Sequence, residues 1–116
     1  MAAYRKGDVI QANVRIDGRG EAKVRPVVVI EQEGEETLRV LPMTSRLPAD
    51  TPHTPIDLLD FVEGGLDMHK ISYVLTASDC RVHTSEVRGK KGRLEGEPME
   101  TIVAAIPTGP KRSGTG

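Results

Sequence analysis

The sequence is poor in aromatic side chains and in cysteine, and both shortages restrict what the chain can be. Its 116 residues include no tryptophan, two tyrosines, one phenylalanine and one cysteine. A single thiol, Cys80, cannot form an intramolecular disulfide, which agrees with a reducing compartment. With one cysteine and three scattered histidines, the sequence supports no zinc site, and we expect neither a metal nor a cofactor.

Long hydrophobic runs are also absent. No apolar stretch approaches the roughly 20 residues that a membrane-spanning helix needs. The N-terminal sequence MAAYRKGDVI lacks the apolar core of a signal peptide, so we expect a cytoplasmic protein without membrane contact. The hydrophobic fraction of 37% is ordinary for a folded soluble domain. We expect one domain over residues 1–106 and a flexible tail over residues 107–116.

Charge is nearly balanced overall but unevenly distributed along the chain. The net charge is −1, yet residues 1–30 carry +3, residues 31–69 carry −7, residues 70–94 carry +4 and the remainder −1. If the first and third blocks fold together, one face of the molecule is basic although the whole is almost neutral. Such a face is compatible with a polyanionic partner, although charge blocks are most often solvated surface.

Short β-branched and alternating segments dominate the chain. Pro26–Ile30 is a run of apolar residues typical of a buried strand, and we place Pro26 at its first residue because proline cannot donate a ladder hydrogen bond. Arg25 then stands at the rim of that strand. The glycine-containing stretch Arg88–Arg93 is interpreted as a basic turn. The other expected strands are Val9–Ile16, Leu38–Met43, Pro55–Leu59, Ile71–Thr76 and Arg81–His83.

One segment has a clear helical period. Met99, Ile102, Val103 and Ile106 follow one another at helical spacing, and the helix is expected at about 97–106. A helix this short needs tertiary support, so its apolar stripe must dock on the sheet or on a second subunit. Many short strands with one terminal helix predict a mainly β fold, a small antiparallel barrel or strongly bent sheet.

Five short pieces of sequence occur in a characteristic order and together extend over most of the chain, from Arg5 to Ile106. The pieces are KGDVI from Lys6, KVRPVVVI from Lys23, LPMTS from Leu41, GL at Gly65 followed by SYV from Ser72, and GRL from Gly92. In this order they resemble the MazF/PemK family of toxin endoribonucleases from type II toxin–antitoxin modules.

The resemblance implies an SH3-like antiparallel barrel of the CcdB/PemK type, a homodimer and a cognate antitoxin with an acidic segment. It also implies metal-independent, sequence-selective cleavage of single-stranded RNA, leaving 2′,3′-cyclic phosphate and 5′-hydroxyl ends. The family's two best-known catalytic positions correspond to Arg25 and Thr44.

These two residue types suit the chemistry. An arginine presents a planar fork of donors to phosphate oxygens and stays charged at any working pH. Arg25 therefore suits charge stabilisation better than proton transfer, and the Thr44 hydroxyl can bind a phosphate oxygen or orient the 2′-hydroxyl. From the residues alone, an arginine at a strand start is more often a surface ion-pair partner, and a Thr-Ser pair is usually a turn former.

Four further residues are candidates for RNA binding. Lys23 can neutralise a neighbouring phosphate, and Ser45 offers a second hydroxyl beside Thr44. Arg81 matches an arginine that in the family often follows a carboxylate, a glutamine and an apolar residue. Here Ser78 stands in place of the carboxylate, so Asp79 is expected to serve as the carboxylate.

The proton carrier stays open between Asp79, His83 and another group, since histidine titrates near neutral pH but is often structural. With few aromatic rings, we expect little base stacking and a recognition that rests on a basic groove. Two alternatives to the nuclease are a gyrase poison resembling CcdB and a barrel that binds without catalysis. The first is disfavoured because the chain ends SGTG without the C-terminal aromatic of that family.

Overall fold

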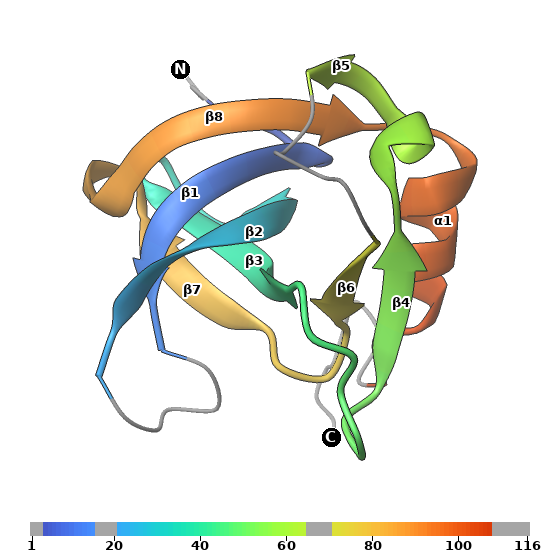
Figure 1. The fold of residues 1–116 in the computed structure, drawn as a ribbon. Helices are drawn as coiled ribbons and strands as arrows, with labels where there is room; N and C mark the ends of the chain where they lie inside the picture. Colours follow the sequence, from blue (N-terminus) through green and yellow to red (C-terminus); the bar gives the residue numbers. More distant parts are fainter. Residues whose placement is uncertain (1–3, 16–20, 65–70, 108–116) are drawn as a thin grey trace.

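The protein folds as a curled antiparallel sheet with one C-terminal helix, seen here in a computed structural model that describes residues 4–15, 21–64 and 71–107 (Figure 1). The predicted fold class is therefore confirmed. Of the expected tail at residues 107–116, all but Pro107 lies outside the described residues. The elements are β1 (Asp8–Val14), β2 (Lys23–Gln32), β3 (Thr37–Thr44), β4 (His53–Ile56), β5 (Phe61–Gly64), β6 (Ser72–Leu75), β7 (Cys80–His83), β8 (Val87–Leu94) and α1 (Glu97–Ala104), with short 3-10 turns η2 (Leu58–Asp60) and η3 (Thr84–Glu86).

The strands follow the order β4-β6-β3-β2-β1-β8-β5, with β7 paired to β3 outside this path. The order makes β2 the centre of the sheet, between β1 and β3. The short turn η3 joins β7 directly to β8, which is paired with β1. The sheet therefore curls so far that β7, which pairs with β3, also contacts β1 (Figure 1).

Both faces of the central strands are buried, which explains the apolar run in β2. Val28 and Ile30 point into a first core, which also holds the α1 residues Met99 and Ile102. Val27 and Val29 point to the opposite face, into a second core enclosed by β1, β3 and β7. Strands buried on both sides read as continuous hydrophobic runs rather than as alternating ones.

Strands β6 and β7 together form one interrupted strand along a single edge of β3. β6 pairs with the end of β3 through Met43↔Val74, whereas β7 pairs with its beginning through Val40↔Cys80. The segment between them, residues 76–79, bulges out of the ladder. Such interruptions let a sheet bend sharply, and here the bend carries β6 and β4 away from the curl toward α1.

The helix occupies the predicted position. α1 ends at Ala104, and its stripe residues Met99, Ile102 and Ile106 are buried in the first core, with Val103 packed against them. The expectation that this short helix docks on the sheet is confirmed. The proline at its first turn has no amide hydrogen to leave unsatisfied there.

The prediction that Pro26 is the first residue of its strand is wrong. β2 starts three residues earlier, at Lys23. The pairing of β2 with β3 begins only at Val27↔Pro42, while Pro26 is paired with Gln11 of β1. The first residues of β2 therefore form an edge toward β3, and an edge tolerates a residue without an amide hydrogen.

Two further predictions near glycines and prolines are wrong. The expected basic turn at Arg88–Arg93 is part of β8, in which the buried Gly92 lies between Val9 of β1 and Gly64 of β5. The strand expected over Pro55–Leu59 is β4, which begins earlier at His53 and gives way to η2. The charged residues of β8 suggested a turn. They are nevertheless compatible with a strand, because charged side chains can stay on the solvent side of a paired strand.

Gly7 connects three strands at one point. Its amide donates to the Val29 carbonyl at 2.8 Å, and its own carbonyl accepts from the Leu94 amide at 2.8 Å. Its φ of +96° is one that side chains rarely adopt, and a Cβ there would collide with the Leu94 carbonyl oxygen.

We expect Gly7→Ala to lower the free energy of unfolding by about 2 kcal/mol or more, because the strain and the collision both act on backbone. Gly34→Ala is the matched control, since no atom lies within 4 Å of the added Cβ, and a change within about 0.5 kcal/mol is expected. Denaturant unfolding of both variants measures the difference. Equal stability of the two variants would contradict this account of Gly7.

Candidate active site

Arg25 and Thr44 lie beyond the last pair that joins β2 to β3, Val27↔Pro42. Past that pair, β2 stays paired with β1 through Arg25↔Ala12, while β3 pairs with β6 through Thr44↔Tyr73. Each residue is two positions from the last pair on its own strand, and side chains two residues apart on a strand point to the same face. Arg25 and Thr44 therefore face the same side of the sheet, at the point where β2 and β3 separate.

Within the described residues, the charge of Arg25 has no carboxylate partner. The side chain is half-buried beside Ala12, its register partner on β1. Its Nε atom is buried without a hydrogen-bond partner, and a buried donor left unsatisfied costs free energy. The charge of the half-buried guanidinium remains available to an anionic oxygen.

Thr44 closes β3 and turns the chain. Its Oγ1 accepts a hydrogen bond from the Arg46 amide at 3.2 Å, so the residue forms the expected turn. This bond uses an acceptor site of the hydroxyl and leaves its own hydrogen available as a donor. Turn formation and phosphate binding are therefore compatible at this residue.

Tyr73 and His53, which the sequence analysis did not single out, extend the same row of side chains. Tyr73 of β6 is the register partner of Thr44, and Pro55 of β4 is the partner of Tyr73. The His53 ring meets the Tyr73 ring edge-on, with centroids 5.5 Å apart and an interplanar angle of 86°. The Nδ1 atom of His53 donates to the Thr51 carbonyl at 2.8 Å, which fixes the ring orientation.

The sequence analysis did not identify Tyr73 and His53 as site residues, because their positions depend on the pairing of four strands. His53 lies two residues before the strand expected over Pro55–Leu59, whereas in the structure it begins β4. The only local signal was the SYVL alternation of β6, which marks a strand without showing its neighbour. The row that we call the β2–β4 row consists of Arg25, Thr44, Tyr73 and His53.

Lys23 and Ser45 flank this row. Lys23 begins β2 opposite Val14 of β1 and lies two residues before Arg25, so it shares the face of Arg25. Its side chain is exposed. Ser45 follows the end of β3 and is exposed as well. Both residues are free to contact a ligand that spans the β2–β4 row.

Asp79 and Arg81 lie at the start of β7, beside the first half of β3. Arg81 is the register partner of Arg39, which is five residues, or about 17 Å, along β3 from Thr44. Asp79 accepts a hydrogen bond from Arg39 Nε at 2.7 Å, and Arg81 binds both carboxylate oxygens of Glu33, at 2.8 and 3.1 Å. The structure therefore separates these two candidates from Arg25 and Thr44 and occupies each with an ion pair.

Arg39 is the centre of this second cluster. Its side chain is 8% exposed and also contacts Glu31 at 3.0 Å. Burial alone would lower the pKa of Arg39, but the hydrogen bonds and charges of Asp79 and Glu31 outweigh burial and raise it. The hydrogen bond to Glu33 likewise raises the pKa of Arg81. This cluster ties β2, β3 and the β6–β7 bulge together.

Cys80 is not placed as a nucleophile. Burial, and then the charge of Asp79, raise the pKa of the Cys80 thiol to about 11. At neutral pH the thiol is protonated, whereas the thiolate is the reactive form.

His83 has a structural role at the far end of β3. It pairs with Thr37, seven residues or roughly 24 Å along the strand from Thr44. Its Nδ1 atom accepts from the Ser85 amide at 3.0 Å and caps η3, while Nε2 contacts Glu36 at 2.8 Å. The site thus leaves His83 remote from Arg25 and Thr44.

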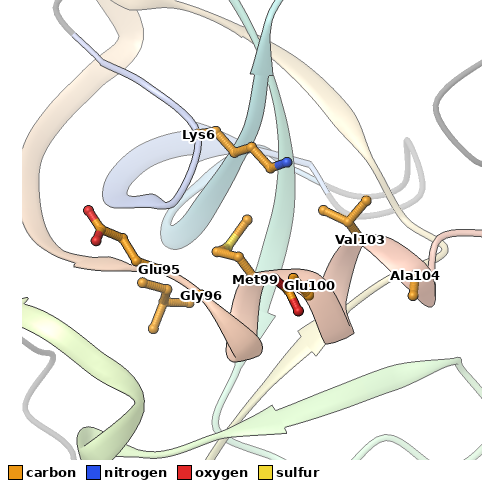
Figure 2. A pocket seen from close by; sticks show the side chains of 8 residues that line it. Lys6, Glu95, Gly96, Met99, Glu100, Val103 and Ala104 are labelled. Carbon is orange, nitrogen blue, oxygen red and sulfur yellow. The ribbon is translucent and has the colours of Figure 1, made fainter.

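An apolar pocket lies away from the β2–β4 row. About 510 Å³ in volume, it lies against α1 and is lined by Leu94, Met99 and Val103. Figure 2 shows Lys6 across this pocket from the helix, with the carboxylates of Glu95 and Glu100 also on the lining. Its apolar lining does not suit a polyanion, so we do not place the chemistry there.

A sequence model of PemK-like, MazF-like toxins of type II toxin–antitoxin systems matches residues 5–108. The chain belongs to this family. The resemblance inferred from the five sequence pieces is thereby confirmed, and the chain is a toxin of the MazF/PemK type. No curated protein matches the sequence.

Solved structures of related toxins share the fold at low sequence identity. The Mycobacterium tuberculosis toxin MazF-mt6 superposes with a TM-score of 0.64 at 18% identity, over 85% of this chain and 91% of that chain. An endoribonuclease from a mycobacterial species gives 0.61 at 14%, over 97% and 98%. An endoribonuclease in complex with its cognate antitoxin, also mycobacterial, gives 0.60 at 15%, over 91% and 93%.

None of the helices in the described residues has the length and apolar character to cross a membrane. No group of three or more His, Cys, Asp or Glu side chains in these residues is arranged to hold a metal ion.

We expect Arg39→Met to lower the free energy of unfolding by about 2–3 kcal/mol, because it leaves Glu31 and Asp79 facing each other without a cation. The matched control is Arg81→Met, which removes an arginine whose side chain is 56% exposed. Exposed pairs contribute little, so its loss should be below about 1 kcal/mol. Denaturant unfolding measures both, and equal losses would show that burial of Arg39 does not matter.

Proposed function

We propose that this toxin is a sequence-selective endoribonuclease that cleaves single-stranded RNA without a metal ion, acts in the cytoplasm and is neutralised by an antitoxin. The proposal rests on Arg25 and Thr44, which lie two residues beyond the last β2–β3 pair, Val27↔Pro42, on the same face of the sheet. Two further facts support it: the guanidinium has no carboxylate partner in the described chain, and related folds are endoribonucleases.

In this proposal the ribose 2′-oxygen attacks the adjacent phosphorus. The new bond closes a 2′,3′-cyclic phosphate, and the bond from phosphorus to the 5′-oxygen of the next nucleotide breaks. The 2′-hydroxyl loses a proton and the leaving 5′-oxygen gains one, so no co-reactant is consumed. Negative charge accumulates on the non-bridging phosphate oxygens in the transition state.

Arg25 stabilises that charge. Its donors bind the non-bridging oxygens, and its half-buried position strengthens the interaction because less water screens it. Thr44 donates its hydroxyl hydrogen to a phosphate oxygen or to the 2′-oxygen and holds the attacking group in line. Lys23 and Ser45 bind the flanking RNA.

The proposed partners follow from the charge pattern. An antitoxin with a disordered acidic segment can occupy the surface around Lys23 and Arg25, because these cations carry no ion pair in the described chain. A mycobacterial relative was solved in complex with its cognate antitoxin. A homodimer would place two β2–β4 rows on one particle and would give a long single strand two points of attachment.

The test is incubation of purified protein with mixed-sequence RNA in excess EDTA, followed by mapping of the new ends. We expect cleavage that leaves 5′-hydroxyl ends. Arg25→Ala should cut kcat by about 100-fold or more, because it removes a donor to the developing charge. The control Arg88→Ala removes an exposed arginine from β8 and should cleave normally.

The controls separate the possible failures. An Arg25→Ala sample purified identically also excludes contaminating nuclease as the source of cleavage. Intact RNA after incubation with folded wild-type protein would contradict the nuclease assignment. Normal cleavage by Arg25→Ala would instead place the chemistry at other residues.

A further inference from the structure

Tyr73 differs from the other two aromatic residues in what it touches. Phe61 packs against the first core and Tyr4 against the second, whereas Tyr73 belongs to neither. It lies half-buried on β6 between the buried residues Ser72 and Val74. Core packing therefore does not explain the position of the Tyr73 ring, although both of its neighbours in the chain are buried.

The position of Tyr73 is next to the residues of the proposed chemistry. It is the direct register partner of Thr44, and so points to the same face with a Cβ separation of about 5 Å. In the described chain, the aromatic contact with His53 is the one specific interaction of its side chain, and the phenolic hydroxyl has no hydrogen-bond partner.

His53 holds the ring in a defined orientation. Its own ring is fixed through the Nδ1 hydrogen bond to Thr51, and it meets Tyr73 edge-on. Edge-to-face pairs of this kind are favourable and restrict the motion of both rings. Tyr73 is thus held in place before any ligand arrives.

We propose that the Tyr73 ring is the platform on which one nucleotide base stacks beside the scissile phosphate. This inference rests on the proposed ribonuclease function and adds its specificity element. Proteins that bind single-stranded RNA hold unstacked bases against aromatic side chains in this way. A base fixed there aligns its ribose with Thr44 and Arg25, so Tyr73 positions the substrate and does not take part in the chemistry.

The inference changes the expectation drawn from composition. Three aromatic residues suggested that stacking contributes little, but a single ring suffices when it stands at the reacting nucleotide. The remaining recognition still rests on cations and hydrogen bonds along the strand.

The first experiment uses wild-type protein and a series of RNA oligonucleotides, each with one abasic ribose at or near the cleaved bond. An abasic ribose keeps its 2′-hydroxyl and phosphates, so the chemistry itself is intact. We expect kcat/KM to fall by roughly ten- to a hundredfold when the missing base is one of the two that flank the cleaved phosphate. Equal cleavage of every abasic oligonucleotide would overturn the proposal.

The second experiment asks whether Tyr73 is what senses the base. Tyr73→Leu should lose a similar factor on intact RNA and should no longer distinguish intact from abasic RNA. Tyr73→Phe keeps the ring and should behave like the wild type. A Tyr73→Phe variant as impaired as Tyr73→Leu would assign the effect to the hydroxyl and contradict stacking.

Phe61→Leu is the matched control, because it makes the same change in shape at an aromatic residue outside the β2–β4 row. It should retain the full abasic penalty. If Tyr73→Leu also retains that penalty, the platform is elsewhere and the inference fails, while cleavage by the wild type and its loss in Arg25→Ala would leave the proposed function standing. If Tyr73→Leu does not fold, Tyr73→Met, which also lacks the ring, takes its place in the same comparison of intact with abasic RNA.

Discussion

The structure depends on the pairing of β2 with β3. This pairing places apolar side chains of both strands in two cores at once, so a shift by one residue would exchange the residues of the two faces. Burial on both sides therefore fixes the register strongly. The same register places Arg25 and Thr44 two residues beyond its last pair, Val27↔Pro42, on one face of the sheet where the strands leave the cores. The geometry of the proposed site is in this sense a consequence of core packing.

The second general feature is the division of the cations into two groups. Arg39 is held by Glu31 of β2 and by Asp79 of the bulge before β7. Arg81 is held by Glu33, which follows β2, and Arg93 by Glu63 and Glu95. These pairs stabilise strand contacts. Lys23 and Arg25, in contrast, have no ion pair in the described chain. A nearly neutral protein can thus keep a local positive charge, because its carboxylates form ion pairs elsewhere in the fold.

Much of the fold could be predicted because its signals are local. The buried apolar run predicts the strand β2, and the helical period that ends at Ile106 predicts the helix α1, each from its own residues alone. The strand β8 was missed because its glycines and charges imitate a turn, and only its pairing with β1 and β5 makes it a strand. The site divides in the same way. Arg25 came from a sequence motif, whereas Tyr73 became visible only through pairing across β3 and β6.

The central claim is that Arg25 and Thr44 act on one phosphate. A double-mutant cycle of Arg25→Lys and Thr44→Val, measured as kcat for one RNA cleaved at one bond, tests this most directly. Residues that bind the same group in the transition state are strongly coupled, so the double variant should be much less impaired than the product of the two single effects. Independent, multiplicative effects of the two substitutions would contradict the account.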